Sequence, residues 1–164
     1  MALNAYARLT INRQSLQGDT SVQTVGGVDV SSDHIEVYEL RWGSAVPAAA
    51  SGGRTGRVEM CPILITKRID QTTPRLYQAL STNSQVEGDI KIFDTDPNDG
   101  TTRHRFTLVL GRGRLLSMTS SSPDAMDPAF SARPPREVAA IVATSLTYRD
   151  EIYSVEYEQE AIVR

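Results

Sequence analysis

The sequence has little of what marks several common protein classes. Cys61 is the one cysteine among 164 residues, so no disulfide can form within the chain, which fits a reducing compartment such as the cytosol. No apolar run approaches the ~20 residues that a membrane-spanning helix needs. The stretch from Met1 to Arg8 has neither a basic head nor an apolar core. We therefore expect no membrane contact and no signal peptide.

The net charge and the aromatic content are also low, and each argues against a particular kind of partner. Lys and Arg number 17 against 20 Asp and Glu, for a net charge of −3, and this balance provides no basic stripe for nucleic acid. Aromatic residues make up 6% of the chain, which disfavours a barrel that holds a small apolar ligand. The content of 40% hydrophobic and 23% charged residues is typical of a globular protein. The length predicts one domain over residues 1–164.

Alternation of apolar and polar residues predicts many short strands. They are expected at 3–11, 34–42, 58–66, 86–93, 102–110, 115–121, 138–148 and 153–158, with an additional short strand around 22–30. In the first of them Tyr6 falls on the polar face. Gly26-Gly27 and the segment Asp94 to Gly100 are rich in turn formers, and long loops are expected at 44–57 and 122–136. This pattern predicts a mainly β fold, either a barrel or a sandwich.

One short helix is expected at about Pro74 to Ser81. Thr73 is a residue type that accepts hydrogen bonds from the free N–H groups of a first helical turn, and Pro74 has no N–H to leave unpaired. Leu76, Ala79 and Leu80 fall on one face of this helix, the spacing of a helix that packs on an apolar surface.

The acidic segment Asp94 to Gly100 imitates the start of a calcium-binding loop. Such a loop needs Gly at its sixth position and a bidentate Glu at its twelfth, where this chain has Asp99 and Arg105. The segment is therefore interpreted as a solvated hairpin turn.

Other candidate sites lack the residues that their chemistry needs. His34 and His104 are far apart and have no further ligands at zinc-binding spacing. Cys61 has no evident base, so a packed core thiol is expected. Gly52 to Arg57 and Gly111 to Arg114 lack the Gly-Lys-Ser/Thr ending of a phosphate loop, which favours flexible turns with solvated arginines. We expect no catalytic residues, no metal and no cofactor.

Lys67, Arg68 and Asp70 have two open interpretations. They form either a plain exposed charge cluster, where ion pairs contribute ~0–1 kcal/mol, or a contact that faces a neighbouring subunit, where desolvation makes the pairing more consequential.

Three segments of the chain resemble one known family. The first is Ile35 to Gly43, a strand that ends in Trp-Gly; the second is the Gly- and Arg-rich loop Ser51 to Arg57; the third is Thr66 to Asp70 followed by Thr73 to Leu76. In this order they are similar to the haemolysin-coregulated protein (Hcp) family, which builds the inner tube of the bacterial type VI secretion system. Two segments, 12–32 and 122–136, depart from the family pattern.

The resemblance implies a small β-barrel of two antiparallel sheets with one helix. It implies a structural, non-enzymatic protein that assembles in the cytoplasm and is secreted without a signal peptide. Six copies would form a ring, and stacked rings would form a tube that carries effectors beneath a spike and inside a sheath. By the same resemblance Ser51, Gly52, Gly53, Arg54, Thr55, Gly56 and Arg57 would reach the adjacent ring.

Rival interpretations come from other functional classes. A small-ligand-binding β-barrel would be a monomer with an apolar cavity, a hydrolase would have a cleft with convergent titratable groups, and a phage-type tail tube would assemble by the same physical logic.

Overall fold

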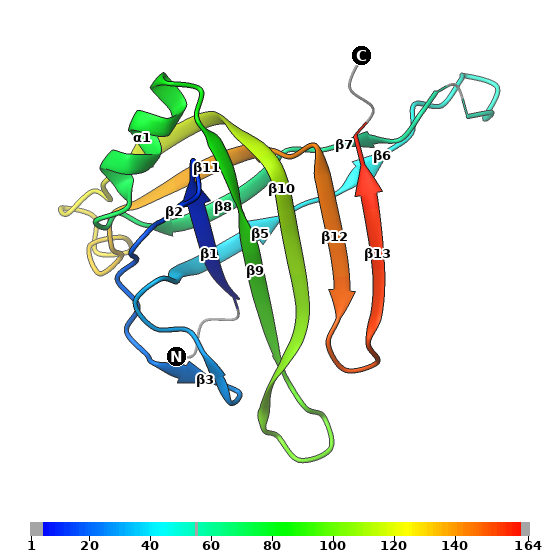
Figure 1. Cartoon of the computed structure of the whole chain (residues 1–164). Coiled ribbons are helices and arrows are strands. Elements are labelled where there is room, and N and C mark those ends of the chain that lie inside the picture. Colours follow the sequence, from blue (N-terminus) through cyan, green and yellow to red (C-terminus); the bar gives the residue numbers. More distant parts are fainter. Residues whose placement is uncertain (1–4, 55, 162–164) are drawn as a thin grey trace.

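The computed structural model describes residues 5–54 and 56–161 and shows thirteen strands and one helix in these ranges (Figure 1). The elements are β1 (Ala5–Ile11), β2 (Gln14–Ser15), β3 (Thr24–Val25), β4 (Val28–Asp29), β5 (Ile35–Arg41), β6 (Ser44–Ala45), β7 (Glu59–Met60), β8 (Ile63–Arg68), α1 (Thr73–Ser81), β9 (Gln85–Thr95), β10 (Thr102–Ser121), β11 (Arg136–Val142), β12 (Ser145–Asp150) and β13 (Val155–Glu160). Leu3, which the sequence placed in the first strand, lies outside the described residues.

Nine strands form one antiparallel sheet that closes on itself. Their order is β11-β8-β5-β1-β9-β10-β12-β13, β2 pairs with β1, and β10 also pairs with β11. The closure depends on the length of β10, which pairs with β9 and β12 in its first part and with β11 from Arg114 to Ser121. Interruptions of the β9–β10 register near Phe106 and Gly113 are bulges of the kind that let a long strand bend. The predicted fold class, mainly β with antiparallel strands and one short helix, is confirmed. The expected two sheets are corrected: one nine-stranded sheet closes on itself, and β3–β4 and β6–β7 form two small sheets of two strands each.

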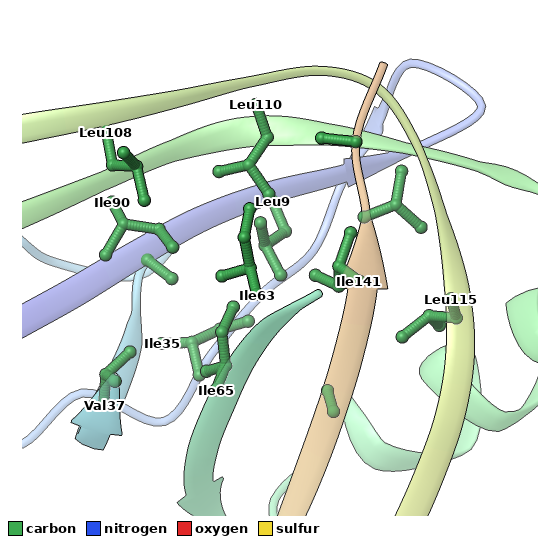
Figure 2. Close-up of a cluster of buried hydrophobic side chains, with 14 of the residues drawn as sticks. Leu9, Ile35, Val37, Ile63, Ile65, Ile90, Leu108, Leu110, Leu115 and Ile141 are labelled. Carbon is green, nitrogen blue, oxygen red and sulfur yellow. The ribbon is translucent and has the colours of Figure 1, made fainter. Parts of the chain in front are cut away.

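Apolar side chains fill the interior of the closed sheet (Figure 2). Leu9, Ile65, Ile90 and Ile141 from four different strands are each at most 2% exposed. Helix α1 packs against β10 and buries Leu76 and Ala79, with Leu80 partly buried against the same core, as the helical spacing predicted. A small barrel filled by its own side chains has a packed core.

A second, smaller core lies on the outer face of β1. Tyr6 is 1% exposed and packs with Val25, Val30 and Phe93. The β3–β4 hairpin supplies Val25 and turns at Gly26-Gly27, both with positive φ, and Val30 directly follows β4. The expected turn is confirmed, but the prediction that Tyr6 lies on a polar face is wrong, because a hairpin from another part of the chain covers that face.

Several predicted strand boundaries are also corrected. Segments 102–110 and 115–121 form the single strand β10, so Gly111 to Arg114 is bulged strand and not a flexible turn. Segment 138–148 is divided into β11 and β12 around Ala143, and segment 58–66 is interrupted at Cys61-Pro62. The turn at Asp94 to Gly100 is confirmed: it joins β9 and β10, and the Asp96 side chain accepts a hydrogen bond from the Asn98 N–H at 2.8 Å.

Within the described ranges, the single helix is too short and too polar to cross a membrane.

Candidate assembly surfaces

A long arm projects from the barrel between β5 and β8 (Figure 1). The arm begins and ends in a short antiparallel pair, β6 and β7, of two residues each. At this root, Ser44 Oγ donates a hydrogen bond to Gln159 Oε1 of β13 at 3.0 Å. Further out, Ala48 bridges Arg54, and the chain reverses at Gly52, whose φ is 85°. The segment expected to be a plain loop is therefore a partly paired arm.

The residues predicted to reach an adjacent ring lie together at the end of this arm. Residues 50–54 and 56–59 are all exposed, and Thr55 lies outside the described residues. The backbone hydrogen bonds of the turn are made within the arm, from Ala49 N–H to Gly53 O at 2.7 Å and from Gly52 N–H to Ala49 O at 2.9 Å. Arg54 and Arg57 make no ion pair with any described residue. The arm thus exposes its backbone and the side chains of two arginines at its end.

Cys61, next to the arm, is exposed, so the prediction of a packed core thiol is wrong. Its backbone N–H donates to Gly43 O at 2.8 Å, which holds the arm root together, while Pro62 interrupts the strand.

Lys67 is the centre of a buried ion cluster, which corrects the interpretation of an exposed charge group. Its side chain is 1% exposed, and Nζ lies 2.9 Å from Asp70 Oδ1 and 2.6 Å from Glu137 Oε1. It also donates to Arg68 O at 2.7 Å. The Asp70 and Glu137 side chains are 6% and 0% exposed. Of the three residues predicted to face a neighbouring subunit, Arg68 alone is exposed.

The same cluster fixes the start of α1. Asp70 Oδ1 accepts hydrogen bonds from the Thr72 N–H at 2.9 Å and the Thr72 hydroxyl at 2.5 Å. Thr73 accepts from the Asp70 N–H and donates to Glu137 Oε1. Thr73 is therefore the first helical residue, and the prediction that it caps the helix N–H groups is wrong. No local pattern pointed to Glu137, because its pairing with Lys67 joins positions 70 residues apart.

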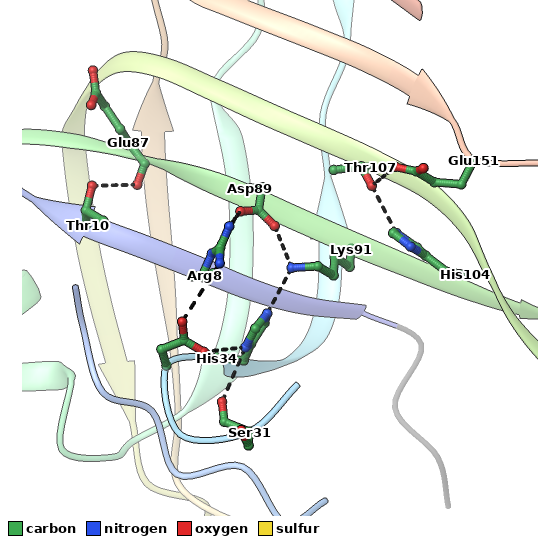
Figure 3. A network of polar contacts seen from close by, with 11 residues as sticks. Arg8, Thr10, Ser31, His34, Glu87, Asp89, Lys91, His104, Thr107 and Glu151 are labelled. Atoms are coloured by element: carbon green, nitrogen blue, oxygen red, sulfur yellow. Dashed lines mark hydrogen bonds and ion pairs between the residues drawn. The ribbon is translucent and has the colours of Figure 1, made fainter. Parts of the chain in front are cut away.

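A polar network on the outside of β1 and β9 holds the segment before β5 in place (Figure 3). Asp89 pairs with Arg8 and Lys91, and Lys91 Nζ lies 2.9 Å from Nε2 of the buried His34. Burial acts to raise the pKa of Asp89, but the hydrogen bonds and charges of Lys91 and Arg8 outweigh it, and the pKa lies below its ordinary value. This network joins β1, β9 and the segment before β5, and its role is structural.

His104 belongs to a second polar group, with Thr107 and Glu151 (Figure 3). Its Nε2 lies 2.9 Å from Thr107 Oγ1, which donates to Glu151 Oε1. Burial lowers the pKa of His104, against the opposing charge of Glu151. Across the described residues, no three His, Cys, Asp or Glu side chains gather as a possible metal site.

Strand β13 leaves one edge of the large sheet unpaired in the described structure. Its neighbourhood exposes large apolar side chains: Tyr153, Val155 and Tyr157 are 73%, 62% and 65% exposed. The Tyr157 ring stacks on Tyr148 with centroids 6.3 Å apart. Such an edge is a template for pairing with another chain.

Comparison with known proteins identifies the family. The family model described as "Type VI secretion system effector, Hcp" matches residues 12–153, most of the chain. Among solved structures, the fold is similar to a crystal structure of an Hcp protein (TM-score 0.82, 18% identity, 97% of this chain and 98% of that one). It is also similar to Hcp1 from the E. coli EAEC 042 pathovar (0.80, 19%, 97% and 99%) and to secreted protein Hcp3 from Pseudomonas aeruginosa (0.73, 18%, 99% and 100%). A comparison with the sequences of curated proteins found no match. At these identities the structural likeness shows a shared fold, while the family model covers the sequence itself. The chain therefore belongs to the Hcp family of type VI secretion system proteins.

Proposed function

We propose that this chain is a structural subunit of the inner tube of the type VI secretion system and performs no catalysis. Six copies form a ring, rings stack into a tube, and the tube carries effectors, bounded by spike and sheath proteins. Assembly takes place in the cytoplasm, and the protein is then exported without a signal peptide. A head-to-tail contact that closes makes a ring, and a second contact along the axis makes a filament.

The projecting arm is the observation that carries this proposal. Its tip forms hydrogen bonds within itself and exposes Gly52, Gly53 and Arg54. A folded protomer has no need of such an arm, because exposed residues of this kind contribute little to its stability. The unpaired edge of β13 supplies a second surface for copies of the chain.

The packed interior argues against a small-ligand-binding barrel. Ile35, Ile63 and Leu108 meet inside the closed sheet and are each at most 1% exposed (Figure 2). A phage-type tail tube would use the same surfaces, and the match to the secretion family favours the secretion tube.

Deletion of Gly52 to Gly56 tests the role of the arm. We expect rings to persist and tubes to be lost in electron micrographs, because the deletion removes the contact between rings. The protomer should keep its circular dichroism spectrum and its melting temperature to within ~2 °C, since changes at exposed positions are typically within ±0.5 kcal/mol.

The matched control keeps the length of the arm. Gly43 lies at the root of the arm, outside the segment Ser51 to Arg57; it has no positive φ, and a Cβ at this position would meet no atom within 4 Å, so Gly43→Ser should form tubes like the wild type. Tubes of normal length from the deletion variant would refute a stacking role for the arm.

A further inference from the structure

A basic cleft lies where β10 ends and β11 begins. It is lined by Ser121, Pro123, Phe130, Arg133, Pro134 and Arg136. All of these residues belong to or border the irregular 122–135 loop, which departs from the pattern of the family. The Arg133 guanidinium lies over the Phe130 ring, 4.6 Å from its centroid.

The arginines of this region have no acidic partner within 5–54 and 56–161. Arg136 is directly opposite Arg68 in the β8–β11 ladder, an arrangement of like charges that is unfavourable by itself. Among the described residues, neither these two nor Arg133 makes an ion pair. The carboxylates of the same loop, Asp124 and Asp127, accept hydrogen bonds from the Met126 and Ala129 N–H groups at 2.9 Å and make no ion pair with these arginines. Two arginines without an ion pair, Arg133 and Arg136, therefore line the cleft, and Arg68 lies next to Arg136 in the ladder.

The opposite end of β10 carries the complementary charge. The hairpin tip from Asp96 to Gly100 contains two carboxylates and no cation. Asp96 is engaged by Arg103 at 2.8 Å, whereas Asp99 makes no ion pair with a described residue. Asp99 Oδ1 accepts from the Thr101 N–H at 2.9 Å and the Thr101 hydroxyl at 2.7 Å, and these hydrogen bonds keep the pKa of Asp99 below its ordinary value. The tip is thus a preformed turn with a charge directed at solvent.

We propose that the cleft of Arg133 and Arg136 receives the acidic hairpin tip, with Asp99, of a second copy of this chain. The inference rests on the proposed self-assembly and adds to it one specific contact. The 20 residues of β10 lie between the two surfaces, a path of roughly 60 Å along the bent strand at ~3.3 Å per residue. Figure 1 shows the hairpin between β9 and β10 and the loop between β10 and β11 at different ends of the molecule, so a chain does not fill its own cleft. A contact between two different surfaces is head-to-tail and can be repeated from copy to copy.

Charge reversal at each surface tests the contact. Arg136→Glu places a carboxylate opposite Arg68, so the protomer should be no less stable than the wild type. Asp99→Arg changes an exposed turn residue. In each variant alone, positions 136 and 99 of the two copies carry like charges. Association, measured by sedimentation at ~0.15 M salt where screening reaches ~8 Å, should therefore weaken about tenfold or more.

A mixture of the two variants gives the decisive measurement. If Arg136→Glu and Asp99→Arg copies alternate, every cleft meets a hairpin of opposite charge, so equimolar mixing should restore the assembly that each variant lacks alone. Arg112→Glu, at an exposed position in the middle of β10, is the matched control and should assemble normally.

The outcomes separate this inference from the proposed function. Rings or tubes that are indifferent to both reversals would overturn the contact and leave the proposed function standing, and the cleft would then serve an acidic segment of another protein. Loss of assembly without rescue in the mixture would also overturn it. A wild type that stays monomeric would refute the proposed function and this contact together.

Discussion

Removal of the Lys67 ammonium tests the ion cluster that joins β8, β11 and the start of α1. Lys67→Met keeps the length of the side chain and removes the donor to Asp70 at 2.9 Å, to Glu137 at 2.6 Å and to Arg68 O at 2.7 Å. The two carboxylates are 6% and 0% exposed, so the variant leaves them buried without a cation. Loss of one partner from a buried ion pair costs ~3–5 kcal/mol. For a domain of this size we expect the melting temperature to fall by roughly 6–20 °C.

Thermal unfolding followed by circular dichroism, at one fixed protein concentration, measures this effect, because assembly would otherwise stabilise the samples unequally. Glu137→Gln is the matched control: its amide oxygen still accepts from Lys67 and Thr73, so the loss should be ~1–2 kcal/mol. The triple variant with Lys67→Met, Asp70→Asn and Glu137→Gln carries no buried charge and should be more stable than Lys67→Met alone. A loss below ~1 kcal/mol for Lys67→Met, or no recovery in the triple variant, would refute the reasoning.

Two further predictions concern β9. Asp89→Asn should lower stability at neutral pH; because the folded-state pKa of Asp89 is depressed below 3.8, the wild-type advantage is complete above that value and should disappear in unfolding curves as the pH falls below it. Gly88→Ala should prevent folding or cost more than ~3 kcal/mol, since its Cβ would lie 2.0 Å from Arg8 O in the paired β1 strand. Gly27→Ala, with positive φ but open space around the Cβ, should cost only ~1–2 kcal/mol, and equal losses for the two variants would contradict this account of Gly88.

Local patterns in the sequence were sufficient for most of the secondary structure. Period-two alternation located the strands around 35–41 and 86–93, and the dense turn formers from Asp94 to Gly100 located the hairpin between β9 and β10. The apolar spacing of Leu76 and Ala79 gave the helix and its buried face. These signals are strong because each depends on neighbours within about ten residues of the chain.

The errors arose where distant segments meet. Tyr6 is buried because the β3–β4 hairpin folds over β1, and Lys67 is buried because Glu137 lies opposite it in the β11 strand. The alternation of apolar and polar residues along a strand does not show which of its faces another segment will cover. It also does not show which charge a distant carboxylate will neutralise. The closure of the sheet likewise depends on β10, which pairs with both β9 and β11. The bulges that let β10 bend between these partners have no recognisable sequence pattern.

The candidate surfaces were found unequally. The Gly- and Arg-rich residues of the arm stood out through their likeness to a family, and the structure places those it describes together on a projection. The cleft of Arg133 and Arg136 gave no such signal, because its charge becomes significant only when β11 sets Arg136 opposite Arg68. Which side chains face each other across two strands depends on the register of pairing, and this register is known only once the strands are paired in the folded chain.

The mass of the purified protein in solution tests the central claim, that the outer surfaces of this 18.0 kDa chain exist to meet copies of itself. Native mass spectrometry and light scattering should find a closed ring with about six times the protomer mass, and electron micrographs should show rings that stack. A single protomer that persists at high protein concentration, with no ring in either measurement, would contradict the claim.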